Sequence, residues 1–123
     1  MTASHPFEAV LKVEARSSTV EVDGVEIHYR AWDGPADATP VLLVHGMLAH
    51  SHWWDAVAGW LAKDRRVVAL DLSGMGDSAR RTAYSRSGHA REIAAVAEHA
   101  DLAEAMLVAH SYGGDPAIRA ARN

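Results

Sequence analysis

The sequence predicts an α/β fold in which an N-terminal β-hairpin precedes a parallel β-α-β-α-β-α unit. Two observations support this prediction. Residues 18–34 alternate apolar and polar side chains around a turn signal, a pattern typical of two half-buried strands. Three later runs are continuously apolar and are separated by segments with helical periodicity. Such runs are typical of parallel strands that are buried on both faces by intervening helices.

The predicted hairpin turns at Asp23-Gly24, because both residue types tolerate positive φ. Its apolar positions are Val20, Val22, Val25, Ile27, Tyr29 and Ala31. Residues 1–16 show no convincing period, and we expect them to form a loose N-terminal arm. One domain is therefore expected over residues 17–123.

The rest of the chain alternates between strand and helix. We expect buried strands at residues 41–46, 66–71 and 105–110, and helices at residues 52–64, at residues 88–102 and from residue 115 onward. Ser51 is the expected cap of the first helix. Pro116 suits the first turn of the last helix, where amides lack intrahelical partners. The apolar face of the first helix is expected to comprise Trp53, Val57, Trp60 and Leu61.

Composition excludes several classes of protein. The 123 residues are 49% hydrophobic and 23% charged, which is ordinary for a globular domain. A net charge of −4 without a basic stripe argues against a nucleic-acid partner. The absence of cysteine excludes disulfides, thiolate metal sites and cysteine nucleophiles. Because the sequence shows neither a signal-peptide pattern nor a membrane-length apolar run, we expect a cytoplasmic protein without a membrane partner.

The stretch AHSYGG after the last predicted strand contains a candidate nucleophile, Ser111. A sharp strand-to-helix turn strains its apex, so the residues two positions away must be small, as Ala109 and Gly113 are. Such a turn would hold the Ser111 hydroxyl clear of the sheet. The backbone amide of Tyr112 would then point to where an oxyanion forms. The alternative is that Ser111 only caps the following helix.

The stretch HGM after the first buried strand favours the catalytic interpretation. Gly46 allows a sharp turn, so the Met47 amide is a candidate second oxyanion donor. His45 is expected to support this loop by hydrogen bonding rather than to act as a base. The later stretch SGMGDS lacks the third glycine of a dinucleotide-binding motif, since Ala79 stands there.

Taken in order, VLLVHG, the helix containing Trp54, DLSGMGDS and VAHSYGG resemble the N-terminal half of an α/β-hydrolase-fold enzyme over roughly residues 17–123. The resemblance implies a Ser-Asp-His triad with Ser111 as nucleophile. It also implies that the oxyanion donors are the amides of Met47 and Tyr112. It implies neither a cofactor nor a metal.

The same resemblance assigns structural roles to Asp71 and Asp77. This sequence departs from the family at Ala109, where glycine is usual, a small-for-small change that we expect to be tolerated. A serine at the elbow disfavours the haloalkane dehalogenases and most epoxide hydrolases of this fold, which attack through a carboxylate. The candidates for an apolar pocket wall are Trp53, Trp54 and Met75, with core packing expected for at least one tryptophan.

In this family the nucleophile precedes the acid and the histidine, whereas this chain stops inside the helix after Ser111. We therefore expect a truncated domain that is inactive by itself. In the fold's usual strand order, the strand before Ser111 would here become an exposed apolar edge. That edge is expected to pair with a complementing C-terminal half or with a second copy of the chain.

The chain's own histidines are not expected to replace the missing base. His50 and His52 lie near the oxyanion loop and are candidates for lining the pocket. His110 is expected to pack or face solvent, because adjacent side chains diverge on a strained turn. We expect His28, His89 and His99 to be solvated on surface elements.

The leading hypothesis is a serine hydrolase that acts on a small ester-like substrate through an acyl-enzyme, without a cofactor. Two alternatives use the same serine, namely a carbon–carbon bond hydrolase acting on a diketone-like substrate and a cofactor-free perhydrolase. A third alternative is a non-catalytic interaction module that recruits a partner through the open sheet edge.

Overall fold

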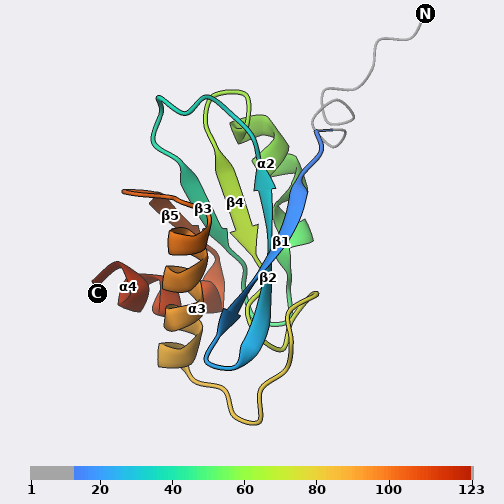
Figure 1. Cartoon of the computed structure of the whole chain (residues 1–123), viewed down its shortest axis with the longest axis vertical. Helices are drawn as coiled ribbons and strands as arrows, with labels where there is room; N and C mark the ends of the chain where they lie inside the picture. The colour runs from blue at the N-terminus through green and yellow to red at the C-terminus, as the bar shows by residue number, and fades with distance from the viewer. Residues whose placement is uncertain (1–12, 123) are drawn as a thin grey trace, which may run out of the picture.

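A computed structural model describes residues 13–122 and shows a five-stranded sheet flanked by helices (Figure 1). In chain order the elements are β1 (Arg16–Val22), β2 (Val25–Trp32), β3 (Val41–Val44), a 3₁₀ helix (Ser51–Trp54), α2 (Asp55–Leu61), β4 (Val67–Leu70), α3 (Arg86–His99), β5 (Met106–Ala109), a second 3₁₀ helix (Ser111–Gly113) and α4 (Gly114–Arg122). Of the arm expected at residues 1–16, residues 1–12 lie outside the described residues. Its last residue, Arg16, belongs to β1.

The strands lie in the order β1-β2-β4-β3-β5. β1 and β2 form the predicted antiparallel hairpin, and its turn residues Asp23 and Gly24 have φ values of 48° and 86°. β2 pairs antiparallel with β4, whereas β3 is parallel to both β4 and β5. The predicted hairpin followed by a parallel β-α-β-α-β-α unit is therefore confirmed.

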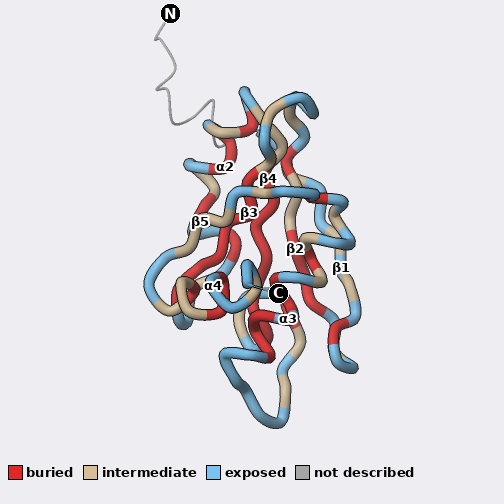
Figure 2. The backbone as a smooth tube through the Cα atoms, turned by 90° about the vertical axis from the view of Figure 1, so that its left-hand side faces the viewer, coloured by how far each residue is buried: buried red, intermediate tan, exposed pale blue. Residues whose placement is uncertain are grey.

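Helices cover both faces of the sheet, with α2 on one face and α3 and α4 on the other (Figure 1). The side chains of β3 divide between these layers because successive residues of a strand point to opposite faces. Leu42 and Val44 pack with α3 and α4, whereas Val41 and Leu43 pack with α2. β3 and β4 are buried along their whole length, which explains their continuous apolar sequences (Figure 2).

The apolar face predicted for the helix at residues 52–64 was wrong. This segment is a 3₁₀ helix followed by the shorter α2. Trp53, Val57 and Trp60 are 59%, 45% and 54% exposed, so the larger apolar side chains lie mostly outside the core. Their spacing indicated a helix correctly but did not indicate which side of it meets the sheet.

Ala58 in α2 and the residues that flank this helix, Trp54 and Ala62, face the sheet and lie four residues apart. The two small alanines allow the helix to approach the sheet closely, and Trp54 fills the space at its start. Trp54, a predicted pocket residue, is instead a core residue that is 8% exposed. Its indole nitrogen has no hydrogen-bond partner within residues 13–122.

The cap predicted for this helical segment was also wrong. His50, not Ser51, precedes the 3₁₀ helix, and its Nδ1 accepts a hydrogen bond from the His52 amide at 3.2 Å. Ser51 is fully buried, and its hydroxyl has no partner among the described residues. Its backbone amide donates to the carboxylate of Asp71.

Within the described residues β5 forms one edge of the sheet, with β3 as its only strand neighbour. Met106 in β5 is 52% exposed. Among residues 13–122, no helix has the length and apolar character needed to cross a bilayer.

Candidate active site

The loops after β3, β4 and β5 meet at the edge of the sheet where these parallel strands end. The amide of His110, after β5, donates to the carbonyl of Val44 at 3.0 Å. A Cβ placed on Gly46 would lie 3.4 Å from the Cβ of Ser111, so the loop after β3 packs directly against the serine turn. In open α/β sheets this edge is where ligands bind.

His45 joins the loop after β3 to the loop after β4. Its Nε2 accepts a hydrogen bond from the Leu72 amide at 3.0 Å, so the ring proton lies on Nδ1 and is donated to the Gly46 carbonyl at 2.7 Å. Burial lowers the pKa of His45 below its ordinary value of 6.5 and favours this neutral form. With both ring nitrogens engaged, His45 has no free nitrogen to take a proton from Ser111.

Ser111 occupies the turn between β5 and α4 and is exposed. Its φ is 52°, a left-handed conformation that is uncommon for a residue with a side chain. Gly113 permits the turn, since a Cβ there would lie 2.5 Å from the His45 carbonyl oxygen. Ala109, two residues before the serine, ends β5 and is half-buried. The local chain is therefore a strained strand–turn–helix junction with an exposed serine at its apex.

A small hollow of about 190 Å³ lies at Ser111. Its other lining residues are Gly46, Met47, Ala49, Trp53 and His110. The rings of Trp53 and His110 lie side by side, with centroids 5.3 Å apart and planes inclined by 30°. Met47 and Trp53 are thus placed beside the serine, as side chains that a bound substrate would meet.

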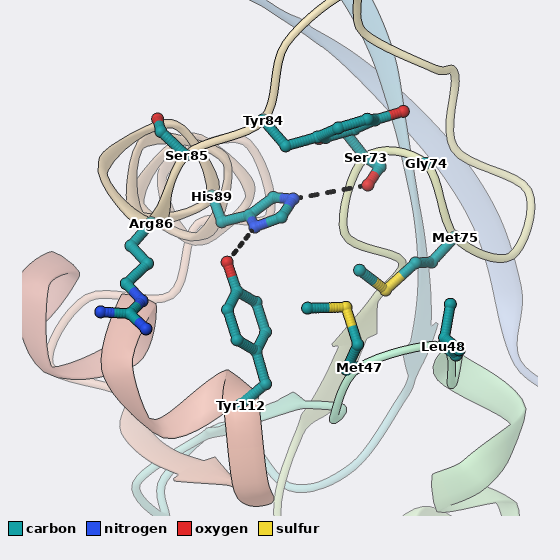
Figure 3. Close-up of a pocket in the computed structure, with 10 residues that line it drawn as sticks. All are labelled: Met47, Leu48, Ser73, Gly74, Met75, Tyr84, Ser85, Arg86, His89 and Tyr112. Atoms are coloured by element: carbon teal, nitrogen blue, oxygen red, sulfur yellow. Dashed lines mark hydrogen bonds between the residues drawn. The ribbon is translucent and has the colours of Figure 1, made fainter.

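A larger cavity of about 410 Å³ adjoins this hollow, and Met47 lines both spaces (Figure 3). Its lining residues are Met47, Leu48, Ser73, Gly74, Met75, Tyr84, Ser85, Arg86, His89 and Tyr112. They come from the three loops, the start of α3 and the turn after Ser111. Met75, a predicted pocket residue, lies in this wall, whereas Trp54 lies in the core.

The carboxylate of Asp71 connects three segments of the chain by hydrogen bonds. It accepts hydrogen bonds from the amides of Ser51 and Asp77 and from the ring of His28 at 2.7 Å. Burial alone would raise the pKa of Asp71, but these hydrogen bonds outweigh it and hold the pKa below the ordinary value of 3.8. Asp71 does not line the hollow at Ser111, so its carboxylate contributes to the geometry of the loops.

His28, Asp71 and Asp77 are the described side chains whose arrangement most resembles a metal-binding cluster, with potential ligand atoms within 4.8 Å of one another. The Asp71 oxygens already accept hydrogen bonds from His28 and from two amides. The Asp71 carboxylate is thus the centre of these hydrogen bonds, in which Asp77 takes part through its backbone amide.

Two histidines expected to be solvated are buried instead. His28 and His89 are only 8% and 2% exposed. His28 lies in β2 and pairs with Asp71, whereas His89 lies on the inner side of α3, one turn before the core residue Ile93. That four-residue spacing was the available sequence signal for His89.

The pairing of His89 with Tyr112 was not predicted. The Nδ1 of His89 lies 2.7 Å from the Tyr112 hydroxyl, and its Nε2 lies 3.4 Å from the Ser73 carbonyl oxygen. Burial raises the pKa of Tyr112 above its ordinary value of 10.0, so its hydroxyl keeps its proton at neutral pH. This contact connects α3 to the residue that directly follows Ser111.

A mixed sheet between helical layers, with an exposed serine on a strained strand–turn–helix junction where its parallel strands end, defines an α/β protein. The model of the alpha/beta hydrolase fold family matches residues 39–123, and the chain belongs to this family.

Curated relatives and solved structures agree with this assignment. The chain is 37% identical over 103 residues to a non-heme chloroperoxidase from Burkholderia pyrrocinia, a match covering 82% of this chain and 37% of that protein. It is 38% identical over 94 residues to a bifunctional esterase/perhydrolase from Acinetobacter calcoaceticus, a match covering 75% of this chain and 34% of that protein. The crystal structure of the Cif epoxide hydrolase from Acinetobacter nosocomialis superposes on this chain with a TM-score of 0.78 at 27% identity. The superposition covers 89% of this chain and 34% of that protein. The chain thus spans little more than a third of these proteins.

Proposed function

We propose that this chain supplies the nucleophile and the oxyanion donors of a serine hydrolase that cleaves small ester-like substrates. The observation that carries the proposal is the exposed Ser111 with a φ of 52° at the carboxyl edge of the sheet. Strained backbone of this kind costs about 1–3 kcal/mol, and it is typically retained where function requires it. The adjoining hollow and cavity offer space for the two sides of an ester.

In the proposed reaction, the Ser111 oxygen attacks the ester carbonyl carbon while a histidine takes the serine proton. The carbonyl oxygen becomes an oxyanion, which the amides of Met47 and Tyr112 stabilise. The bond to the alcohol then breaks, the histidine returns its proton to the leaving oxygen, and water hydrolyses the acyl-enzyme.

The histidine and its orienting acid are proposed to come from polypeptide other than these 123 residues. His45 is fully engaged in hydrogen bonds, and His89 is turned toward Tyr112 and Ser73. The share of each relative that this chain covers, 37% and 34%, leaves room for a C-terminal segment that carries both groups.

The proposal is tested by p-nitrophenyl ester hydrolysis, measured on the product of the complete reading frame that contains these residues. Ser111→Ala is expected to lower kcat/KM by at least ~10³-fold, because it removes the nucleophile. Ser87→Ala is the matched control, since Ser87 is exposed on α3 and lines neither the hollow nor the larger cavity, and it should leave the rate unchanged. Hydrolysis that persists in Ser111→Ala would refute the proposal.

A second candidate activity is the cofactor-free formation of peracids from a carboxylic acid and hydrogen peroxide. The similarity to the esterase/perhydrolase favours it. Both activities would use Ser111 through an acyl-enzyme, with peroxide replacing water in the second step. Peracid production assayed beside ester hydrolysis, with Ser111→Ala in both assays, determines which activity the complete protein has.

A further inference from the structure

The larger cavity combines an apolar wall with a small number of polar groups (Figure 3). Met47, Leu48 and Met75 line one side of it, and the rings of Tyr84, His89 and Tyr112 line much of the remainder. A volume of about 410 Å³ is at the small end of typical ligand pockets. The cavity therefore suits an apolar group of modest size, such as a substituted phenyl ring.

The two contacts of His89 fix which ring nitrogen carries the proton. The carbonyl of Ser73 can only accept, so the Nε2 that lies 3.4 Å from it is the N–H donor. The Nδ1 of the same singly protonated ring is then an acceptor, and the Tyr112 hydroxyl donates to it at 2.7 Å. Tyr112 has thereby used its only hydroxyl proton.

A tyrosine hydroxyl that donates its proton still has lone pairs with which to accept. The Tyr112 oxygen can therefore receive a hydrogen bond from a ligand in the cavity, but it has no proton left to give. In Figure 3 this oxygen lies at the boundary of the cavity, beneath His89. A ligand atom meeting it must be a donor, and a carbonyl or ether oxygen placed there would face another acceptor.

The other polar groups of the wall interact with neighbours in the chain. The Ser85 hydroxyl accepts from the Gly88 amide at 2.9 Å. The Tyr84 hydroxyl accepts from the Arg81 amide at 3.1 Å. Arg86 and the methionines lie on opposite sides of Tyr112. The Arg86 guanidinium is 3.6 Å from the Asp115 carboxylate. Tyr84 and Ser85 accept in these contacts and keep their hydroxyl protons, whereas Tyr112 donates its proton to His89 and is left as an acceptor.

We propose that this cavity binds a neutral apolar group carrying a hydroxyl donor, such as a phenol, with the donor on the Tyr112 oxygen and His89 as the positioning residue. The inference deepens the proposed hydrolase function, because the cavity adjoins the hollow at Ser111 across Met47. In that reaction the bound group would be one side of the ester. Binding itself does not depend on the reaction.

The test compares two inert ligands, 4-propylphenol and 1-fluoro-4-propylbenzene, which are similar in shape and differ in the donor. Their dissociation constants are measured by NMR titration of the product of the complete reading frame that contains these residues. The informative quantity is the ratio of the fluoro compound's Kd to the phenol's Kd. Tyr112→Phe is expected to lower this ratio about five- to tenfold, because it removes the acceptor.

His89→Phe is expected to lower the ratio as well, because the Tyr112 hydroxyl then regains a free proton and loses its fixed orientation. The matched control is Tyr29→Phe, which removes a second tyrosine–histidine contact of 2.7 Å, between Tyr29 and His99, remote from the cavity. This control should leave the ratio unchanged. An amide spectrum of each variant verifies that it is folded.

The wild-type chain provides a test that does not depend on the variants. Binding of the phenol must shift the methyl resonances of Met47 and Met75 saturably. The inference would be overturned if these shifts were absent or if the ratio of Kd values were equal in wild type and Tyr112→Phe. It would also be overturned if Tyr29→Phe lowered that ratio as much as Tyr112→Phe. None of these readouts involves turnover, so the outcome is independent of whether Ser111→Ala abolishes ester hydrolysis.

Discussion

At the scale of single residues, Asp71 and His45 organise the site without taking part in the proposed chemistry. Asp71 ties β2 to the segments that begin at Ser51 and Asp77. His45 ties the loop after β3 to Leu72. Both side chains are almost completely buried, and their hydrogen bonds compensate for the loss of water.

Asp71→Asn is expected to destabilise the chain by about 2–3 kcal/mol, because an amide group cannot accept from all of these donors. The folded state holds the pKa of Asp71 below 3.8, so protons bind the unfolded state first. Its stabilising contribution is complete above pH 3.8 and is lost as the pH falls through the lower folded-state pKa. Urea unfolding at several pH values checks this, and the acid-dependent loss should be smaller in the variant. An equal pH dependence in both proteins would contradict the account.

At the scale of elements, the junction between β5 and α4 places adjacent glycines in different surroundings. A Cβ on Gly113 would lie 2.5 Å from the His45 carbonyl oxygen, whereas a Cβ on Gly114 would meet nothing within 4 Å. Gly114 also has the helical φ of −61°. Only the first glycine is therefore required by the close approach of two loops.

Gly113→Ala is expected to destabilise the chain by about 2 kcal/mol or more, because backbone must move to remove the overlap. Gly114→Ala should be neutral or slightly stabilising, since alanine has the higher helix propensity. Thermal unfolding of the two variants provides a matched comparison. Equal losses of stability in the two variants would show that Gly113 is not confined by the His45 carbonyl.

The start of the α2 segment gives a second prediction at this scale. Ser51→Ala is expected to change the unfolding free energy by less than about 0.5 kcal/mol, because the serine hydroxyl has no partner within the described residues. His50→Ala should cost more, since His50 is the residue whose side chain caps the 3₁₀ helix. Denaturant unfolding of both variants checks the order. A cost near 1 kcal/mol for Ser51→Ala would support the cap predicted from sequence instead.

Local sequence signals predicted the sheet and the serine turn because they depend on short-range properties. Asp23-Gly24 requires positive φ, and the buried strands are continuously apolar. The buried face of α2 was not predictable in this way, because alanines rather than tryptophans meet the sheet. The partners of the buried His28 and His89 are Asp71 and Tyr112, which lie 43 and 23 residues away, and no local pattern identifies these partners.

At the scale of the whole molecule, the chain presents an incomplete sheet edge within its described residues. β5 pairs only with β3, and Met106 is 52% exposed. An unpaired apolar edge is a template for further strand pairing. We propose that this edge joins either a complementing C-terminal segment or a second copy of the chain.

The isolated chain is accordingly expected to self-associate through β5 as its concentration rises. Met106→Lys should reduce the association, because a charge on the edge opposes pairing. Val57→Lys is the matched control, as Val57 is 45% exposed on α2, away from the edge. Sedimentation velocity measures both variants, and suppression by Val57→Lys alone would place the contact on α2 instead.

The central claim, that Ser111 is built to be a nucleophile, is tested most directly by covalent labelling. The product of the complete reading frame containing residues 1–123 is treated with a fluorophosphonate, digested and analysed by peptide mass spectrometry. The account predicts one stoichiometric adduct on Ser111, absent from Ser111→Ala and retained in Ser87→Ala. An adduct on a different residue, or no adduct in a folded protein that hydrolyses esters, would contradict it.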